Sequence, residues 1–185
     1  GLWEGHRVED VATPEAFARD QGLVHQFYNA RRARLGEVEP NAAHVALARL
    51  DAEWPGDFLI VTQNVDLLHE AAGSRKLIHM HGQMGQMLCN NCGQRAAWGE
   101  EALRIDMACG HCDTAGGLRP DVVWFEETLP EDALARAEDA ARRADVMLVV
   151  GTSAEVWPAA ALPRYAKGAG ARVIDYRERP DLAAK

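Results

Sequence analysis

The segment 58–66 constrains the fold of this chain more than any other part of its sequence. Four consecutive apolar residues, 58–61, are followed at once by the polar residues 62–64 and then by Asp66. A short, unbroken apolar run is typical of a strand that is buried on both faces of a parallel sheet. Because ligands bind just beyond the carboxyl ends of the strands in such sheets, we expect functional polar groups at this point.

The rest of the chain alternates between strand-like and helix-like patterns. Thr13 and Pro14 are typical of a helix N-cap and a first helical position. The segment 116–120, rich in glycine, is expected to be a loop. The alternation predicts an α/β fold with a Rossmann-like, doubly wound parallel sheet. We expect strands at 58–61, 76–79, 146–150 and 172–176, and helices at 22–35, 42–53, 65–72, 132–143 and 158–167.

His81 and Gly82 follow the strand that is expected at 76–79. A histidine can titrate near neutral pH, and a glycine lets the backbone turn sharply or approach a ligand closely. Structural interpretations remain open for the segment 58–83 taken by itself. Amides at strand ends often only cap a helix, a single histidine is usually structural, and Asp66 can serve as a negative charge at a helix N-terminus.

Two Cys-x-x-Cys pairs indicate a metal site. Cys89 and Cys92 are separated from Cys109 and Cys112 by sixteen residues, a spacing typical of four-cysteine zinc sites. Because the protein fills all four positions of the tetrahedron, we expect one structural zinc ion rather than a catalytic one. The alternatives are a redox role for one pair, and His111 in place of one cysteine ligand.

Composition limits the classes of partner. The chain of 185 residues is 48% hydrophobic and 26% charged, with a formal net charge of −8. This balance argues against general binding to nucleic acid or to a membrane surface. No apolar run approaches the roughly 20 residues of a membrane span. The chain begins at Gly1 without a methionine and shows no signal peptide, which suggests a processed or excised chain; reduced cysteines then predict a cytoplasmic location.

Five motifs, in their order along the chain, resemble those of the sirtuin family of NAD-dependent protein-lysine deacylases. They are TQNVD at 62–66, IHMHG at 78–82, the two cysteine pairs, VVWF at 122–125 and GTS at 151–153. The resemblance extends from GLW at the amino end to about residue 180. It implies that NAD is the cosubstrate, that acyl-lysine proteins or peptides are the substrates, and that nicotinamide and O-acyl-ADP-ribose are released.

The resemblance also implies roles for individual residues around the reacting ribose. His81 corresponds to the general base that deprotonates a hydroxyl of the nicotinamide ribose, a task that suits an imidazole with a pKa near the working pH. His79, by contrast, is expected to be structural. Gln63 and Asn64 correspond to residues that hold this ribose, and Asp66 to the carboxylate that binds the nicotinamide amide.

The remaining motifs correspond to the adenosine end of NAD, to the peptide groove and to the zinc site. In the family, a turn lies under the adenosine ribose and phosphate, the acyl-lysine peptide adds as a strand, and four cysteines hold a structural zinc. The corresponding residues here are Gly151, Thr152 and Ser153 for the turn, Val123, Phe125, Glu126 and Val156 for the groove, and Cys89, Cys92, Cys109 and Cys112 for the metal.

Tyr28 and Arg31 are three residues apart on the helix expected at 22–35, so they share one face of it. By spacing alone, a solvated basic face with a half-buried tyrosine is the simpler interpretation. The pair also resembles the Tyr-x-x-Arg of the sirtuin branch that prefers succinyl and malonyl groups. A guanidinium binds a carboxylate through two hydrogen bonds, and the phenol adds a third. The resemblance therefore implies desuccinylation and demalonylation alongside deacetylation.

The chain also departs from the family pattern. The glycine-rich amino-terminal segment and the carboxyl-terminal end of the family are missing, and Glu126 stands where relatives usually have glycine. Two alternatives to an active deacylase follow: a non-catalytic, zinc-stabilised peptide-binding fragment, and a protein ADP-ribosyltransferase. We expect a monomer. Its domains would be a Rossmann-like NAD-binding domain at 37–83 and 119–185, a helical part of a small module at 1–36, and a zinc-binding insert at 84–118.

Overall fold

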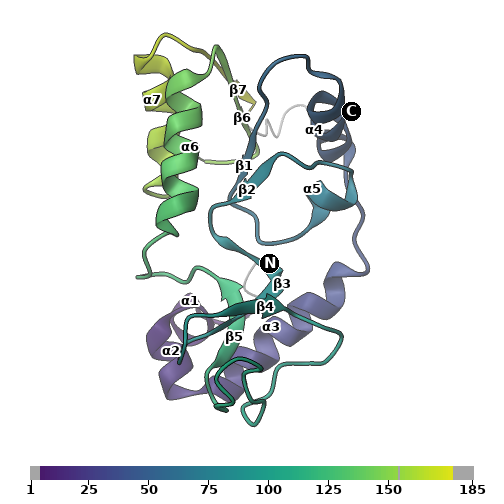
Figure 1. Cartoon of the computed structure of the whole chain (residues 1–185), viewed down its shortest axis with the longest axis vertical. Coiled ribbons are helices and arrows are strands. Elements are labelled where there is room, and N and C mark those ends of the chain that lie inside the picture. Colours follow the sequence, from purple (N-terminus) through teal and green to yellow (C-terminus); the bar gives the residue numbers. More distant parts are fainter. Residues whose placement is uncertain (1–4, 154, 177–185) are drawn as a thin grey trace. The chain divides into compact units, whose positions relative to one another are not determined.

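The computed structural model describes residues 5–153 and 155–176, which belong to two compact units, 1–129 and 130–185 (Figure 1). The amino-terminal GLW and the residues after Tyr176, at the two ends of the family resemblance, lie outside the described residues. Along the described residues, no helix combines the length and apolarity that crossing a membrane requires. The expected division into a Rossmann-like domain and a small module stays a prediction.

The first unit begins with three helices: α1 (Val8–Val11), α2 (Pro14–Arg19) and α3 (Gln21–Leu35). The predicted cap is confirmed, since Thr13 Oγ1 accepts a hydrogen bond from the Ala16 amide at 3.0 Å. The helix predicted at 22–35 is confirmed as α3, one residue longer at its start. Asp20 caps it, with the Leu23 amide 2.9 Å from Asp20 Oδ1.

Helix α4 (Ala42–Glu53) has the predicted bounds and leads into a parallel β-α-β unit. Strand β1 (Ile60–Thr62) pairs with β2 (Leu77–His79), and α5 (Leu68–Ala71) connects them. The strand expected at 58–61 therefore begins two residues later. The helix expected at 65–72 is shorter, because the preceding residues form a turn in which Asp66 Oδ1 accepts from the Leu68 amide at 3.0 Å.

A three-stranded antiparallel sheet, in the order β4-β3-β5, completes this unit. Its strands are β3 (Gly82–Cys89), β4 (Arg95–Ala97) and β5 (Leu118–Val122). The expectation of a loop at 116–120 is wrong for its last three residues, which belong to β5. Glycine, glutamine and proline have little strand propensity, so these strands depend on their mutual pairing rather than on local preference.

Helices α1–α3 pack against this antiparallel sheet and enclose a hydrophobic core (Figure 1). Its members come from distant parts of the sequence, which explains how short, weakly predicted strands are stabilised. Aromatic residues fill much of it: Phe17, Phe27, Tyr28, Trp98 and Trp124 are all buried.

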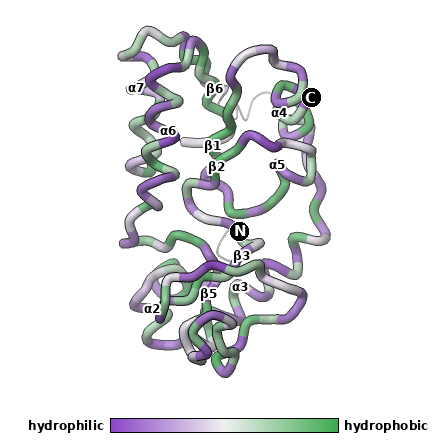
Figure 2. Tube along the Cα trace, viewed as in Figure 1, coloured by the Kyte–Doolittle hydropathy of each residue, from purple (hydrophilic) through white to green (hydrophobic). Residues whose placement is uncertain are grey.

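The second unit contains another parallel β-α-β arrangement. Its elements are α6 (Glu131–Arg143), β6 (Val146–Val150), a 3-10 turn (Ala159–Ala161), α7 (Leu162–Gly168) and β7 (Arg172–Tyr176). Apolar residues run along β6, whereas polar residues recur along α6 (Figure 2). Strands β6 and β7 pair in parallel, as predicted. The helix expected at 158–167 begins as the 3-10 turn. Two parallel crossovers are the building units of the predicted α/β fold.

Candidate functional site

His81 is held between two segments of the first unit. Its Nδ1 lies 3.0 Å from the Gln63 carbonyl oxygen, and its own carbonyl accepts from the Val123 amide at 2.8 Å. Because a carbonyl can only accept, Nδ1 carries the ring proton and Nε2 keeps its lone pair. Burial lowers the pKa of His81, and the hydrogen bond to Gln63 opposes this in part. The imidazole is therefore neutral at neutral pH, with Nε2 able to accept a proton.

Gly82 allows this arrangement because two backbones approach closely at that point. Its φ of +75° is a left-handed conformation that favours glycine. A Cβ added there would lie 2.1 Å from the Asp121 carbonyl oxygen. In the β3–β5 pairing, Gly82 stands opposite Val122, the residue before Val123. The glycine thus brings the segment after β5 alongside His81.

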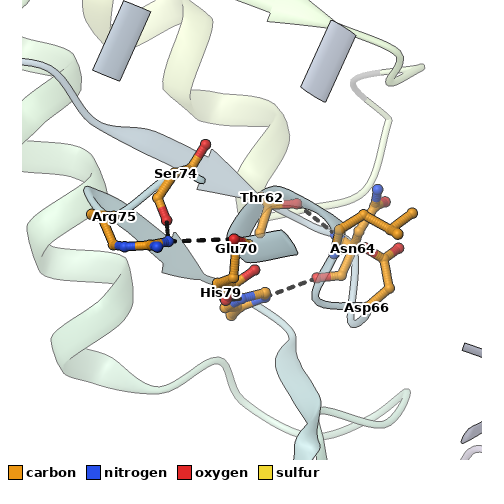
Figure 3. A network of polar contacts seen from close by, with 8 residues as sticks. Thr62, Asn64, Asp66, Glu70, Ser74, Arg75 and His79 are labelled. Carbon is orange, nitrogen blue, oxygen red and sulfur yellow. Dashed lines mark hydrogen bonds and ion pairs between the residues drawn. The ribbon is translucent and has the colours of Figure 1, made fainter. Parts of the chain in front are cut away.

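The polar segment after β1 is fixed by hydrogen bonds on both sides (Figure 3). The Asn64 amide donates to Thr62 Oγ1 at 3.1 Å, and the Met84 amide donates to the Val65 carbonyl at 2.7 Å. His79 contacts the Asn64 carbonyl at 3.1 Å and Glu70 Oε1 at 2.7 Å. These contacts fit the structural role expected of His79. Together the two histidines hold the backbone of the Gln63–Asn64 dipeptide.

Arg31 of α3 and Asp66 line the same small cavity. The cavity has a volume of about 170 Å³, and its remaining lining residues are Arg34, Leu35, Val38, Val65 and Met84. Arg31, which is expected to bind the acyl group, and Asp66, which is expected to bind nicotinamide, therefore lie at one site in the first unit. Sequence reasoning missed Arg34 and Met84 as parts of it. Arg34 follows Arg31 by three residues on the same helix face, which was the available signal.

Tyr28 is more deeply buried than its spacing suggests. Only 3% of it is exposed, and its hydroxyl oxygen accepts a hydrogen bond from Trp124 Nε1 at 2.9 Å. Burial raises the pKa of Tyr28 to about 12, against smaller lowering effects of the Trp124 hydrogen bond and of the Arg31 charge. The phenol therefore stays protonated across the physiological range.

The residues expected to form the peptide groove follow β5 and, in the second unit, β6. The Val123 amide donates to the His81 carbonyl oxygen, and the Phe125 amide donates to the Ala12 carbonyl oxygen at 3.0 Å. Phe125 is 52% exposed, and Glu126 is exposed with φ +71°. That conformation favours glycine, the residue that the family resemblance leads one to expect at this position. Val156, in the second unit, is 50% exposed.

Gly151, Thr152 and Ser153 follow directly after β6 in the second unit, as predicted from the end of the apolar run. The Gly151 amide donates to the Tyr176 carbonyl of β7 at 3.3 Å, and its φ is +63°. No atom lies within 4 Å of a Cβ added to Gly151. The glycine is therefore needed for its backbone conformation rather than for space, and it leaves an open turn at the carboxyl end of the strand.

The four cysteines gather into one cluster. All four Sγ atoms lie within 4.8 Å of one another, and the Cys89–Cys112 and Cys92–Cys109 pairs are both 3.8 Å apart. A tetrahedral zinc ion with Zn–S bonds of roughly 2.3 Å requires sulfur atoms about 3.8 Å apart, so the cluster can hold zinc. Backbone amides of Cys112 and His111 lower the pKa of Cys109 to about 6; at Cys92 the Gln94 amide acts in the same direction, but burial and the other three thiols raise the pKa to about 12. The His111 side chain is exposed and is not part of the cluster.

Comparisons of the sequence with known proteins agree with the family that the motifs resemble. The Sir2 family profile matches residues 1–158. A protein of Bdellovibrio bacteriovorus named NAD-dependent protein deacylase is 49% identical over 168 residues, which are 90% of this chain and 70% of that protein. A protein of Salmonella typhimurium with the same name is 48% identical over 183 residues, which are 97% of this chain and 66% of that protein.

The solved structures that match this chain include Sir2 proteins as well. A Sir2 homologue in complex with NAD matches with a TM-score of 0.85 and 43% identity, covering 95% of this chain and 68% of that chain. A Sir2 protein bound to a myristoylated histone peptide matches with a TM-score of 0.72 and 34% identity, covering 90% of this chain and 71% of that one. The chain thus spans about two thirds of the length of its relatives.

Proposed function

The chain belongs to the Sir2 family, whose curated members similar to it are NAD-dependent protein deacylases, and we propose that it has this activity itself. Acyl groups would leave protein lysines with release of nicotinamide and O-acyl-ADP-ribose. The observation that carries the proposal is the neutral imidazole of His81, held through Nδ1 by the Gln63 carbonyl with Nε2 unprotonated.

NAD supplies the ribose carbon that receives the acyl oxygen as nicotinamide leaves. In this proposal His81 Nε2 takes the proton of a neighbouring ribose hydroxyl, as a general base with a pKa near the working pH can. Gln63 and Asn64 hold that ribose, and Asp66 binds the nicotinamide amide. The turn of Gly151, Thr152 and Ser153 would hold the adenosine end, where an open turn permits close approach of ribose and phosphate.

Val123, Phe125, Glu126 and Val156 would bind the peptide as an added strand. The exposure of Phe125, Glu126 and Val156 supports this role, because a strand can add only to residues that it can reach. The four cysteines, Cys89, Cys92, Cys109 and Cys112, would hold a structural zinc ion whose ligand set is complete without solvent. We propose a monomer in the cytoplasm, acting without nucleic acid or membrane; four free cysteines support a reducing compartment.

We further propose that succinyl and malonyl groups are preferred substrates alongside acetyl groups. Arg31 lines the cavity that Asp66 also lines, so the side chain of Arg31 lies beside the expected nicotinamide site. Tyr28, one helical turn earlier, is near enough to Arg31 for the guanidinium to influence its pKa. A guanidinium and a phenol suit the carboxylate of a short dicarboxylic acyl group.

Replacing Arg31 with methionine tests the acyl preference. We expect NAD-dependent turnover of a succinyl-lysine peptide to fall at least about tenfold, because a charge-assisted pair of hydrogen bonds is lost. Turnover of the matching acetyl-lysine peptide should change little. Arg49→Met removes an exposed arginine of α4 that pairs only with Glu53 in the described contacts, and it serves as the control. Equal losses with both peptides would refute the carboxylate role of Arg31.

A further inference from the structure

The hydrogen bond between Tyr28 and Trp124 fixes the direction in which the phenol can donate. An indole N–H only donates, so the Tyr28 oxygen is the acceptor of this 2.9 Å contact. The phenolic proton cannot point at another donor, and Trp124 Nε1 lies 2.9 Å from the phenol oxygen. The proton must therefore point away from Trp124. Among the described residues, no side chain or carbonyl accepts a hydrogen bond from the Tyr28 hydroxyl.

Trp124 cannot easily turn away from Tyr28, because its neighbours hold it on several sides. Its backbone amide donates to Glu127 Oε2 at 2.8 Å. The Arg119 guanidinium lies 4.0 Å from the centre of its ring, and Arg119 Nη2 pairs with Glu127 Oε1 at 2.6 Å. Trp124 is 3% exposed and Arg119 5%, so both are locked by packing as well as by polar contacts.

Tyr28 and Arg31, which share one face of α3, can therefore offer only donors to a further partner. Arg31 has a guanidinium that never accepts, and the Tyr28 phenol remains protonated because burial raises its pKa to about 12. A carboxylate is the complementary partner, since an ionised carboxylate only accepts. The methyl end of an acetyl group offers nothing to either donor. Discrimination by acyl class would thus depend on the Arg31 guanidinium and, in addition, on the direction of the Tyr28 proton.

We propose that Trp124 is a positioning residue for acyl specificity: its indole N–H occupies the acceptor side of the Tyr28 hydroxyl and commits the phenol to donate to the carboxylate of an acidic acyl group. The proposal rests on the proposed function, since it concerns the acyl group that the deacylase removes. It assigns no contact between Trp124 and substrate. Trp124 acts through Tyr28.

Steady-state kinetics of Trp124→Phe with succinyl-lysine and acetyl-lysine peptides tests this proposal. We expect kcat/KM for the succinyl peptide to fall about fivefold, mainly through KM, because the phenol can then turn away. The value for the acetyl peptide should stay within about twofold. Tyr28→Phe should lower the succinyl-to-acetyl ratio in the same direction, and Trp124→Phe added to Tyr28→Phe should lower it no further.

Trp98→Phe is the matched control. Trp98 is also buried in the first unit, and its Nε1 donates to the Glu101 carbonyl at 3.0 Å rather than to Tyr28. Its replacement should leave the succinyl-to-acetyl ratio unchanged. If Tyr28→Phe changes the ratio but Trp124→Phe does not, the role of Trp124 is overturned while the proposed function stands. If no peptide is turned over with NAD, the proposed function itself is wrong.

A measurement on the unaltered protein covers the case in which Trp124→Phe does not fold. The indole N–H signals, followed by ¹⁵N NMR, should distinguish the two peptides as they bind. A carboxylate that accepts the Tyr28 proton polarises the phenol oxygen and strengthens the bond from Trp124, so its N–H signal should move downfield with succinyl-lysine and not with acetyl-lysine. The Trp98 signal should respond equally to both. Equal responses of Trp124 to the two peptides would overturn the proposal.

Discussion

At the scale of single residues, the protonation state of His81 decides the pH range of activity. Burial lowers its pKa below the usual 6.5, so the imidazole is already neutral at pH 7. We expect kcat/KM to be level between pH 7 and 8 and to fall only below about pH 6.5 as the base becomes protonated. A pH–rate profile measured with saturating NAD checks this. An acid limb above pH 7 would contradict the assignment.

Replacing His81 with asparagine removes the base and should lower turnover by about a hundredfold or more. His111→Asn is the control, because His111 is exposed and lies outside the cysteine cluster. Turnover in both variants, together with their zinc content, separates loss of the base from loss of the fold. A His81→Asn chain with full turnover would rule out His81 as the base.

A second prediction at this scale concerns the contribution of Gly82 to stability. Gly82→Ala places a Cβ 2.1 Å from the Asp121 carbonyl oxygen and keeps a left-handed φ of +75°. The strain and the overlap should together cost at least about 2 kcal/mol of unfolding free energy. Gly99→Ala is the matched control, since nothing lies within 4 Å of a Cβ there. Urea unfolding compares the two; equal stabilities would show that the backbones at Gly82 are not closely apposed.

Some residues that hold the site together carried no recognisable signal in the sequence. Asp51 lies near the end of α4, yet its Oδ2 accepts from the Lys76 amide at 2.9 Å and ties that helix to the start of β2. Arg119 and Glu127 likewise pair only because the chain folds back on itself. Local motifs singled out His81 and Asp66 as candidates and predicted the cluster of four cysteines, because those residues stand in short, ordered patterns. Contacts between residues that lie apart in the sequence could not be predicted from local patterns, because they form only in the tertiary fold.

At the scale of elements, the bounds of α4, β6 and β7 matched their predictions because each has a strong local pattern. Strands β3 and β4 have none. Gly82, Gly85 and two glutamines interrupt β3, and β4 is entirely exposed. Such strands form because β3 pairs with both neighbours and carries Cys89 at its end. Their existence follows from the cysteine cluster and the core rather than from propensity.

The zinc site should therefore support the antiparallel sheet. Removing the metal with a chelator, or replacing Cys92 with serine, should lower the melting temperature and expose the segment 89–112 to proteases, because ligand binding and folding are coupled. His111→Ala should retain one zinc ion per chain. Metal analysis and limited proteolysis check both. If Cys92→Ser retained its zinc or His111→Ala lost it, the four-cysteine assignment would be wrong.

At the scale of the whole molecule, buried histidines link stability to pH. Burial is the main cause that lowers the pKa values of His25, His69 and His81 in the folded chain. Well above pH 6.5 these histidines are neutral in both states, so they leave the unfolding free energy unchanged. Below it the unfolded chain binds protons first, and stability should fall as the pH decreases toward the lowered pKa values.

Urea unfolding at pH 7.5 and pH 5.5 measures this effect. The double variant His25→Gln, His69→Gln should lose less stability on acidification than the unaltered chain, because two of the proton-binding differences are gone. The lowered pKa of Asp51 acts only near and below pH 4, outside this interval. Equal or greater stability of the unaltered chain at pH 5.5 would contradict the burial of these neutral imidazoles.

Deacylation that depends on NAD is the most direct test of what this chain does. The intact protein is incubated with a succinyl-lysine peptide, with and without NAD, and the products are identified by mass spectrometry; an acetyl-lysine peptide runs alongside. A deacylase of this family should yield free peptide, nicotinamide and O-succinyl-ADP-ribose in equal amounts, and only with NAD. Peptide that binds but stays acylated in the presence of NAD would instead identify a non-catalytic peptide-binding protein.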